Sequence, residues 1–202
     1  MIVGVLLDYS GDEVHYKGKR YRVETAFDTV LLIYKLYEEE ILDADEKINQ
    51  ALKMLTRNSI KVHMLSDMEK IELLDKIMQE KIKTTQRPQI GPPKKLMDFE
   101  ADSDYIYASF KQAYGIDLVK ERGKLRWKNF CELLDGLPDQ TKIKEVMKIR
   151  AMEIPEPTKY NQKERQNIVE LKAYYALPIK GRQSENGLET LFITLERMAE
   201  YG

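Results

Sequence analysis

The stretch of residues 94–136 constrains the fold most, because two helix-forming patterns follow one another there without any strand pattern. An acidic segment, DFEAD, leads into a tyrosine-rich segment with Ile106, Phe110 and Ala113 on one side. Gly115 then fits the left-handed position that follows many helices. After a basic connector, apolar residues recur at i, i+3, i+4 and i+7: Trp127, Phe130, Cys131 and Leu134. The stretch therefore predicts two amphipathic helices joined by a short connection.

Most of the remaining sequence also has helical periodicity. Residues 13–24, EVHYKGKRYRVE, are the exception, because their alternation around a central glycine predicts a β-hairpin. Helix patterns follow over residues 30–41, with Ile41 on the apolar face, and from Asp43, Ser66, about Asp139 and Asn161. Glu69 and Glu164 each lie three residues after a capping residue, which predicts two capping boxes. The predicted fold is mostly α, a helical protein with a small N-terminal β-hairpin.

The composition changes at TTQRPQIGPPKK, residues 84–95, where three prolines interrupt the helical period. We predict four segments: a hairpin plus helices over residues 1–83, a proline-rich linker over 84–95, a helical domain over 96–178 and a C-terminal amphipathic helix over 179–202. The apolar stripe of that last helix consists of Leu188, Leu191, Phe192, Leu195 and Ala199.

Composition argues against several classes of function. The net charge is −1, so no overall field attracts the chain to nucleic acid or to an anionic membrane. No window reaches the roughly 18 apolar residues of a membrane-spanning helix. Cys131 is the only cysteine, which excludes an intramolecular disulfide and fits a reducing cytoplasm. These properties are typical of a helix-rich protein with solvated outer faces.

The sequence contains no recognisable catalytic or metal-binding motif. Asp98, Glu100, Asp102 and Asp104 alternate as in a calcium loop. However, serines occupy the two positions where such a loop needs glycine and glutamate, and we interpret the carboxylates as an acidic first turn of a helix. Two histidines and one cysteine do not make a zinc site without added carboxylates. We expect no cofactor, no metal and no enzymatic activity, although a carboxylate pair for acid–base chemistry stays an open alternative.

Two features bear on binding. Cations from Lys120 to Lys128 surround Trp127, as in a surface that tracks a nucleic-acid backbone. Trp127 lies on an apolar stripe, however, so we place it in the core and the cations in solvent.

Tyrosines flank one predicted helix on several sides, which predicts either an internal helix or one that faces a partner. The candidate partner-binding residues are Tyr105, Tyr107, Tyr114, Leu188, Leu191, Phe192 and Leu195.

Several blocks resemble one family. The segments DFEADSDYIYASFKQAYGIDL, LRWKNFCELLDGLPDQTKIKEVMKIRAMEIP and LKAYYALP look like the gene-product-fifteen family of phages and prophages of Gram-positive hosts. The N-terminal VHYKGKRYRVETAFDTVLLI also resembles the opening of that family. The similarity runs from about Val14 to Pro178, and the family supplies no catalytic residues to carry over.

Genes of this family lie in the tail-morphogenesis block, just before the tape-measure gene. The resemblance therefore implies a non-catalytic tail assembly chaperone in the host bacterial cytoplasm. Its partners would be the tape-measure protein and the tail-tube protein, with self-association as a further interaction and no membrane. Two alternatives are a structural tail or head–tail component retained in the virion and a small nucleic-acid-binding regulator.

Overall fold

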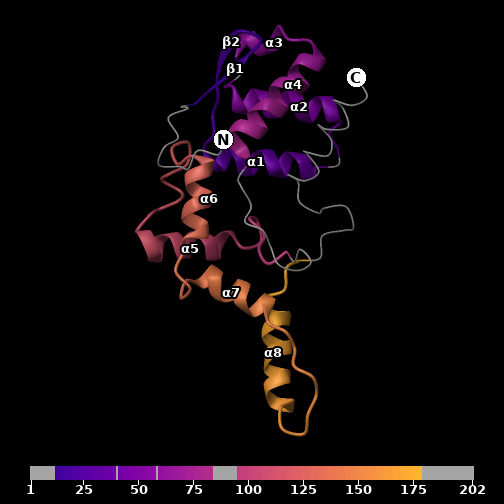
Figure 1. The fold of residues 1–202 in the computed structure, drawn as a ribbon, viewed down its shortest axis with the longest axis vertical. Helices are drawn as coiled ribbons and strands as arrows, with labels where there is room; N and C mark the ends of the chain where they lie inside the picture. The colour runs from indigo at the N-terminus through magenta and orange to yellow at the C-terminus, as the bar shows by residue number, and fades with distance from the viewer. Residues whose placement is uncertain (1–11, 40, 58, 84–94, 179–202) are drawn as a thin grey trace. The chain divides into compact units, whose positions relative to one another are not determined.

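The computed structural model describes residues 12–39, 41–57, 59–83 and 95–178 of the 202 (Figure 1). Within these ranges the chain divides into two compact units. The first contains residues 12–83 and 122–132, and the second contains residues 95–121 and 133–178. Residues 122–132 thus pack in the first unit although they lie inside the predicted helical domain 96–178. The predicted C-terminal helix over 179–202, and all but the last residue of the predicted linker, lie outside the described residues.

The first unit begins with the predicted hairpin. Strands β1 (Glu13–Tyr16) and β2 (Lys19–Arg22) are antiparallel, with Val14 opposite Tyr21 and Tyr16 opposite Lys19. Lys17 and Gly18 connect them, and both have positive φ, 46° and 72°. Two successive left-handed residues are what a tight two-residue hairpin turn requires. Val14, Tyr16 and Tyr21 are buried on one face, so the alternation correctly predicted the hairpin.

Helices complete the first unit. They are α1 (Phe27–Glu38), α2 (Ala44–Leu55), the short α3 (Ile60–His63) and α4 (Asp67–Ile77), which continues into a π-helical turn η2 (Met78–Ile82). Helix α2 packs against α1 and α4, and α4 also contacts β1 (Figure 1). The prediction that Ile41 belongs to the apolar face of the first helix is wrong. That helix ends at Glu38, and the Ile41 side chain is 90% exposed.

Capping boxes start two of these helices. The Ser66 side chain accepts the backbone N–H of Glu69, and the Glu69 carboxylate accepts the backbone N–H of Ser66. The predicted box at this position is therefore confirmed. Asp43 and Glu46 form the same reciprocal pair at the start of α2. Each box satisfies N–H groups that have no partner inside the helix.

The segment 122–132 supplies aromatic residues to the core of the first unit. The N–H of Phe27 donates to the carbonyl of Leu125 at 2.9 Å, and the N–H of Trp127 donates to the carbonyl of Thr25 at 2.7 Å. Helix α6 (Trp127–Asp135) starts there, and its Phe130 ring stacks on Phe27 with 4.9 Å between centroids. Trp127 is 3% exposed, and its indole N–H donates to the carbonyl of Ile82 at 3.0 Å. The predicted core position of Trp127 is confirmed.

The second unit is built on α5 (Ser103–Tyr114) and α7 (Lys142–Ala151), with α8 (Gln162–Tyr174) packed against α7. Helices α5 and α7 bury Phe110 and Ile143. Ser109 is fully buried between them, where its hydroxyl donates to the carbonyl of Tyr105 and accepts the N–H of Ile143. Gly115 ends α5 with φ of 69°, as predicted.

Two predicted helix starts need correction. The helix expected near Asp98 begins at Ser103, because Asp98 instead caps a turn by accepting the N–H groups of Glu100 and Ala101. The capping box predicted at Asn161 and Glu164 is also wrong. Asn161 occupies the capping position, but its side chain accepts the N–H of Thr158 and donates to the carbonyl of Glu156. Both side chains satisfy loop groups upstream of the helix. Among the described helices, none is both long enough and apolar enough to cross a membrane.

Candidate partner-binding surface

Helix α8 is the least buried element of the second unit. None of its 13 residues is buried. The segment 152–161 runs alongside it (Figure 1), and together we name them the α8 arm. Arg165 donates to the carbonyl of Pro155 within the arm. The ammonium of Lys172 donates to the carbonyls of Arg150 and Met152, at 2.7 and 2.6 Å, and so caps the C-terminal end of α7. Polar contacts therefore hold the arm, with no apolar core of its own.

A buried ion pair anchors the end of the arm. Asp102 is 1% exposed and Arg150 is 9% exposed, and two guanidinium nitrogens donate to both carboxylate oxygens at 2.6 and 2.7 Å. The same guanidinium donates to the carbonyl of Leu96 at 2.8 Å and to that of Tyr175 at 2.6 Å. Arg150 therefore joins α5, α7, the segment before α5 and the residue after α8. Sequence reasoning missed this node, because the groups that Arg150 binds lie up to 54 residues from it in the chain.

The α8 arm presents apolar side chains to solvent. Tyr174 is 77% exposed and Tyr160 is 97% exposed. Further exposed apolar residues of the arm are Met152, Ile154, Val169 and Leu171. Single exposed apolar side chains are common on protein surfaces, but here six lie on one arm whose helix has no buried residue. Such a surface is typical of a site that a partner covers.

The predicted tyrosines lie in the second unit, and none is fully exposed. Tyr105 is half-buried, and its ring meets that of Tyr175 edge-on at 6.1 Å. The hydroxyl of Tyr114 donates to the carbonyl of Leu133 at 2.9 Å, while Tyr107 is half-buried. The structure thus brings Tyr105 to the end of the α8 arm and ties Tyr114 to the interior of its own unit. Leu188, Leu191, Phe192 and Leu195 lie outside the described residues.

Tyr175, whose ring contacts Tyr105, also binds a lysine. The Lys142 ammonium donates to the hydroxyl of Tyr175 at 2.8 Å and lies 4.9 Å from the centre of its ring. The hydrogen bond to Tyr175 raises the pKa of Lys142. Lys142 therefore helps to fix Tyr175, whose backbone carbonyl accepts a hydrogen bond from Arg150.

Burial is the largest cause of the pKa shifts of the core groups Tyr34, Tyr37 and Cys131 in the first unit. Burial raises the pKa of the Cys131 thiol to about 12, and it also raises the pKa of the Tyr37 hydroxyl. Both groups are therefore protonated and poorly nucleophilic at neutral pH. Within the described ranges, no group of three or more histidine, cysteine, aspartate or glutamate side chains is arranged to hold a metal ion. These groups behave as parts of a packed core.

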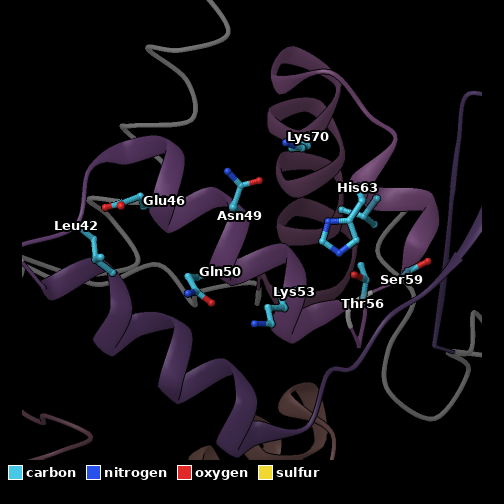
Figure 2. A pocket seen from close by; sticks show the side chains of 10 residues that line it. Leu42, Glu46, Asn49, Gln50, Lys53, Thr56, Ser59, His63 and Lys70 are labelled. Atoms are coloured by element: carbon cyan, nitrogen blue, oxygen red, sulfur yellow. The ribbon is translucent and has the colours of Figure 1, made fainter.

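A hollow of about 340 Å³ lies over α2, α3 and α4 of the first unit (Figure 2). Its lining mixes both signs of charge with amides and hydroxyls: Glu46, Asn49, Gln50, Lys53, Thr56, Ser59, His63 and Lys70. Most of these side chains are exposed, and the Thr56 hydroxyl is already used by the carbonyl of Leu52 at 2.6 Å. Leu42 and Val62 also line the hollow, which is therefore an open surface groove of mixed polar and apolar character. Sequence reasoning gave no indication of it.

The described residues form a mostly helical protein with an N-terminal hairpin and an exposed arm that carries apolar side chains. The chain belongs to the Bacteriophage Gp15 protein family, whose model matches residues 10–177. The resemblance seen in the sequence blocks is therefore confirmed, and the match includes α8. Neither a curated protein nor a solved structure matches the chain. Family membership points to a phage morphogenesis or structural protein.

Proposed function

We propose that the chain is a non-catalytic tail assembly chaperone that acts in the host bacterial cytoplasm. In this role it binds the tape-measure protein and recruits tail-tube subunits. The observation that carries the proposal is the α8 arm, a helix without a buried residue inside the region that the family shares. Its exposed apolar side chains suit contact with a second helix, in the manner of a helix docking in a groove.

The physical demands of the role match a surface of this size. A long helical tape-measure protein with apolar seams self-associates unless those seams are covered. Full burial of a Leu- or Val-sized side chain contributes about 1.5–3 kcal/mol, before the loss of rigid-body freedom is subtracted. The few apolar residues on the α8 arm therefore give moderate affinity. Moderate affinity suits a chaperone that polymerising tail-tube subunits must displace.

The test is co-expression with the tape-measure protein. We expect the wild-type chain to keep that protein soluble and to co-purify with it. The double variant Leu171→Ser/Tyr174→Ser should lose both effects while keeping its circular dichroism spectrum, because both side chains are exposed. Asn167→Ser, on an exposed residue of the same helix, is the matched control and should behave as wild type. If the wild-type chain neither solubilises nor binds the tape-measure protein, the proposal is wrong.

A second measurement separates a chaperone from a structural component. A chaperone leaves as the tube polymerises, so mass spectrometry of purified particles should find little or none of this chain. A stoichiometric amount in the virion would identify a structural tail or head–tail component instead.

A further inference from the structure

We propose that this protein self-associates head-to-tail, with the α3 corner of one copy (Arg57, Ile60, Lys61 and Met64) docking on the acidic corner of the next. The acidic corner is the connection between α1 and α2 together with the first turn of α2. It consists of Ile41 and the carboxylates of Glu39, Asp43, Asp45 and Glu46. This inference goes beyond the proposed chaperone function, because it concerns contacts between copies of this chain and does not depend on any tail protein.

The α3 corner is an apolar surface that its own unit leaves uncovered. Ile60 is 78% exposed and Met64 is 81% exposed. They are four residues apart and therefore project from one side of the turn. Val62, which lies between them in sequence, is 7% exposed and holds α3 against the unit. Large side chains that point outward from a firmly seated turn form a rigid contact surface.

Cations border this apolar surface. Lys61 is exposed, and its ammonium donates to the carbonyl of Arg20 at 3.4 Å, which places the α3 corner beside strand β2. Arg57 is also exposed and pairs with Glu24. From Arg57 to Leu65 the sequence contains no carboxylate. The α3 corner therefore combines an apolar centre with a border that carries Lys61 and Arg57, of which Arg57 is paired with Glu24.

The acidic corner has the complementary character. Ile41 is 90% exposed, and the sequence around it, EEEILDADE over residues 38–46, has six carboxylates. Lys47 follows directly and its ammonium donates to the carbonyl of Tyr37 at 3.3 Å, so carboxylates outnumber cations six to one over residues 38–47. Asp43 and Glu46 are engaged in the capping box of α2, yet both remain exposed at the surface. Glu39 and Asp45 are exposed as well. An apolar side chain with a negative border thus faces solvent here.

The two corners lie at opposite ends of α2. The 12 residues of that helix span about 18 Å at 1.5 Å per residue. Figure 2 shows Leu42 and Glu46 at one end of the helix, with Glu46 in its first turn, and Ser59 and His63 near the other end. Within one copy the two corners therefore lie too far apart to contact each other. Two copies can bring them together, because the apolar centres match and the borders carry opposite charge.

The symmetry of such a contact follows from its chemistry. A contact between two α3 corners would place Lys61 of both copies close together, and a contact between two acidic corners would do the same with carboxylates. Like charges at an interface are unfavourable, so the heterologous pairing is preferred. Heterologous contacts propagate and give rings or open filaments. If the partner were a polyanion instead of a second copy, it would bind the α3 corner. The acidic corner would then have no binding role.

The test uses the purified full chain in analytical ultracentrifugation. We expect the average mass of the wild type to rise with concentration beyond that of a dimer and to fall in high salt. Ile41→Lys blocks one corner, and Ile60→Asp/Met64→Asp blocks the other, so each variant alone should be monomeric. An equimolar mixture should form a one-to-one dimer and stop there, because each partner contributes one intact corner.

The control is Leu32→Lys, which places a lysine on another exposed apolar residue and should leave self-association unchanged. Circular dichroism checks that each variant is folded. A charge-swapped pair, Glu39→Lys with Lys61→Glu, tests the same contact with no apolar change and should restore association that either change alone weakens. A wild type that stays monomeric at all concentrations, or blocked variants that associate alone but do not pair when mixed, would overturn the proposal.

Discussion

Removal of the Asp102 carboxylate tests the view that Arg150 organises the second unit. Asp102→Ala deletes the two hydrogen bonds from Arg150, of 2.6 and 2.7 Å, and the one from the backbone N–H of Asp98, of 2.9 Å, and leaves the buried guanidinium without its counter-charge. Hydrogen bonds to charged groups are worth about 1.5–3 kcal/mol each, and loss of one partner from a buried ion pair costs about 3–5 kcal/mol. Because Arg150 keeps the carbonyls of Leu96 and Tyr175, we expect the free energy of unfolding to fall by about 3 kcal/mol.

The assay is urea unfolding followed by far-UV circular dichroism, with amide hydrogen exchange to assign the loss to α5 and α7. The matched control is Asp139→Ala. That aspartate pairs with Lys148 at 3.0 Å, but the two side chains are 80% and 54% exposed, so the cost should stay below about 1 kcal/mol. If the two variants differ by less than about 1 kcal/mol, the Asp102–Arg150 pair does not have the role assigned to it.

Three further predictions concern single side chains. The raised pKa of Cys131, about 12 against an ordinary 9.0, lowers its thiolate fraction at pH 8 about a thousandfold, so maleimide labelling should be slow in the native protein and fast in urea. Gly115→Ala should cost about 1–2 kcal/mol of unfolding free energy, because φ is 69° although nothing crowds the added methyl. Ser66→Ala should cost about 1 kcal/mol by removing the cap of α4, measured by thermal unfolding against Ser59→Ala, whose side chain makes no cap hydrogen bond.

Local patterns predicted the elements whose determinants are themselves local. The turn at Lys17 and Gly18 needs two left-handed residues, and the alternation on each side of it identified the hairpin. Ser66 with Glu69 marked the start of α4 for the same reason, since both members of the cap lie within four residues. Trp127 was correctly placed in the core, because its stripe repeats at helical spacing.

Local reasoning failed where a side chain has two competing uses. Asp98 and Asn161 are both residues that often cap helices, yet each satisfies nearby loop groups instead. The partner of Asp102 lies 48 residues away at Arg150, and nothing near either residue indicates the other. The sequence of α8, QKERQNIVELKAY, predicts a helix but contains few apolar residues, and only the structure shows that none of them is buried.

The pairing of Phe27 with Phe130 has a consequence for synthesis on the ribosome. Its two aromatic rings are encoded about a hundred codons apart, and residues 122–132 emerge well after the remainder of the first unit. At about 5–20 residues per second, the roughly 40 intervening codons after Ile82 take some 2–8 s to translate. During that interval the apolar surface that later packs against residues 122–132 stays exposed on the nascent N-terminal half. Fragments that stop at the proline-rich stretch should therefore be poor candidates for expression on their own.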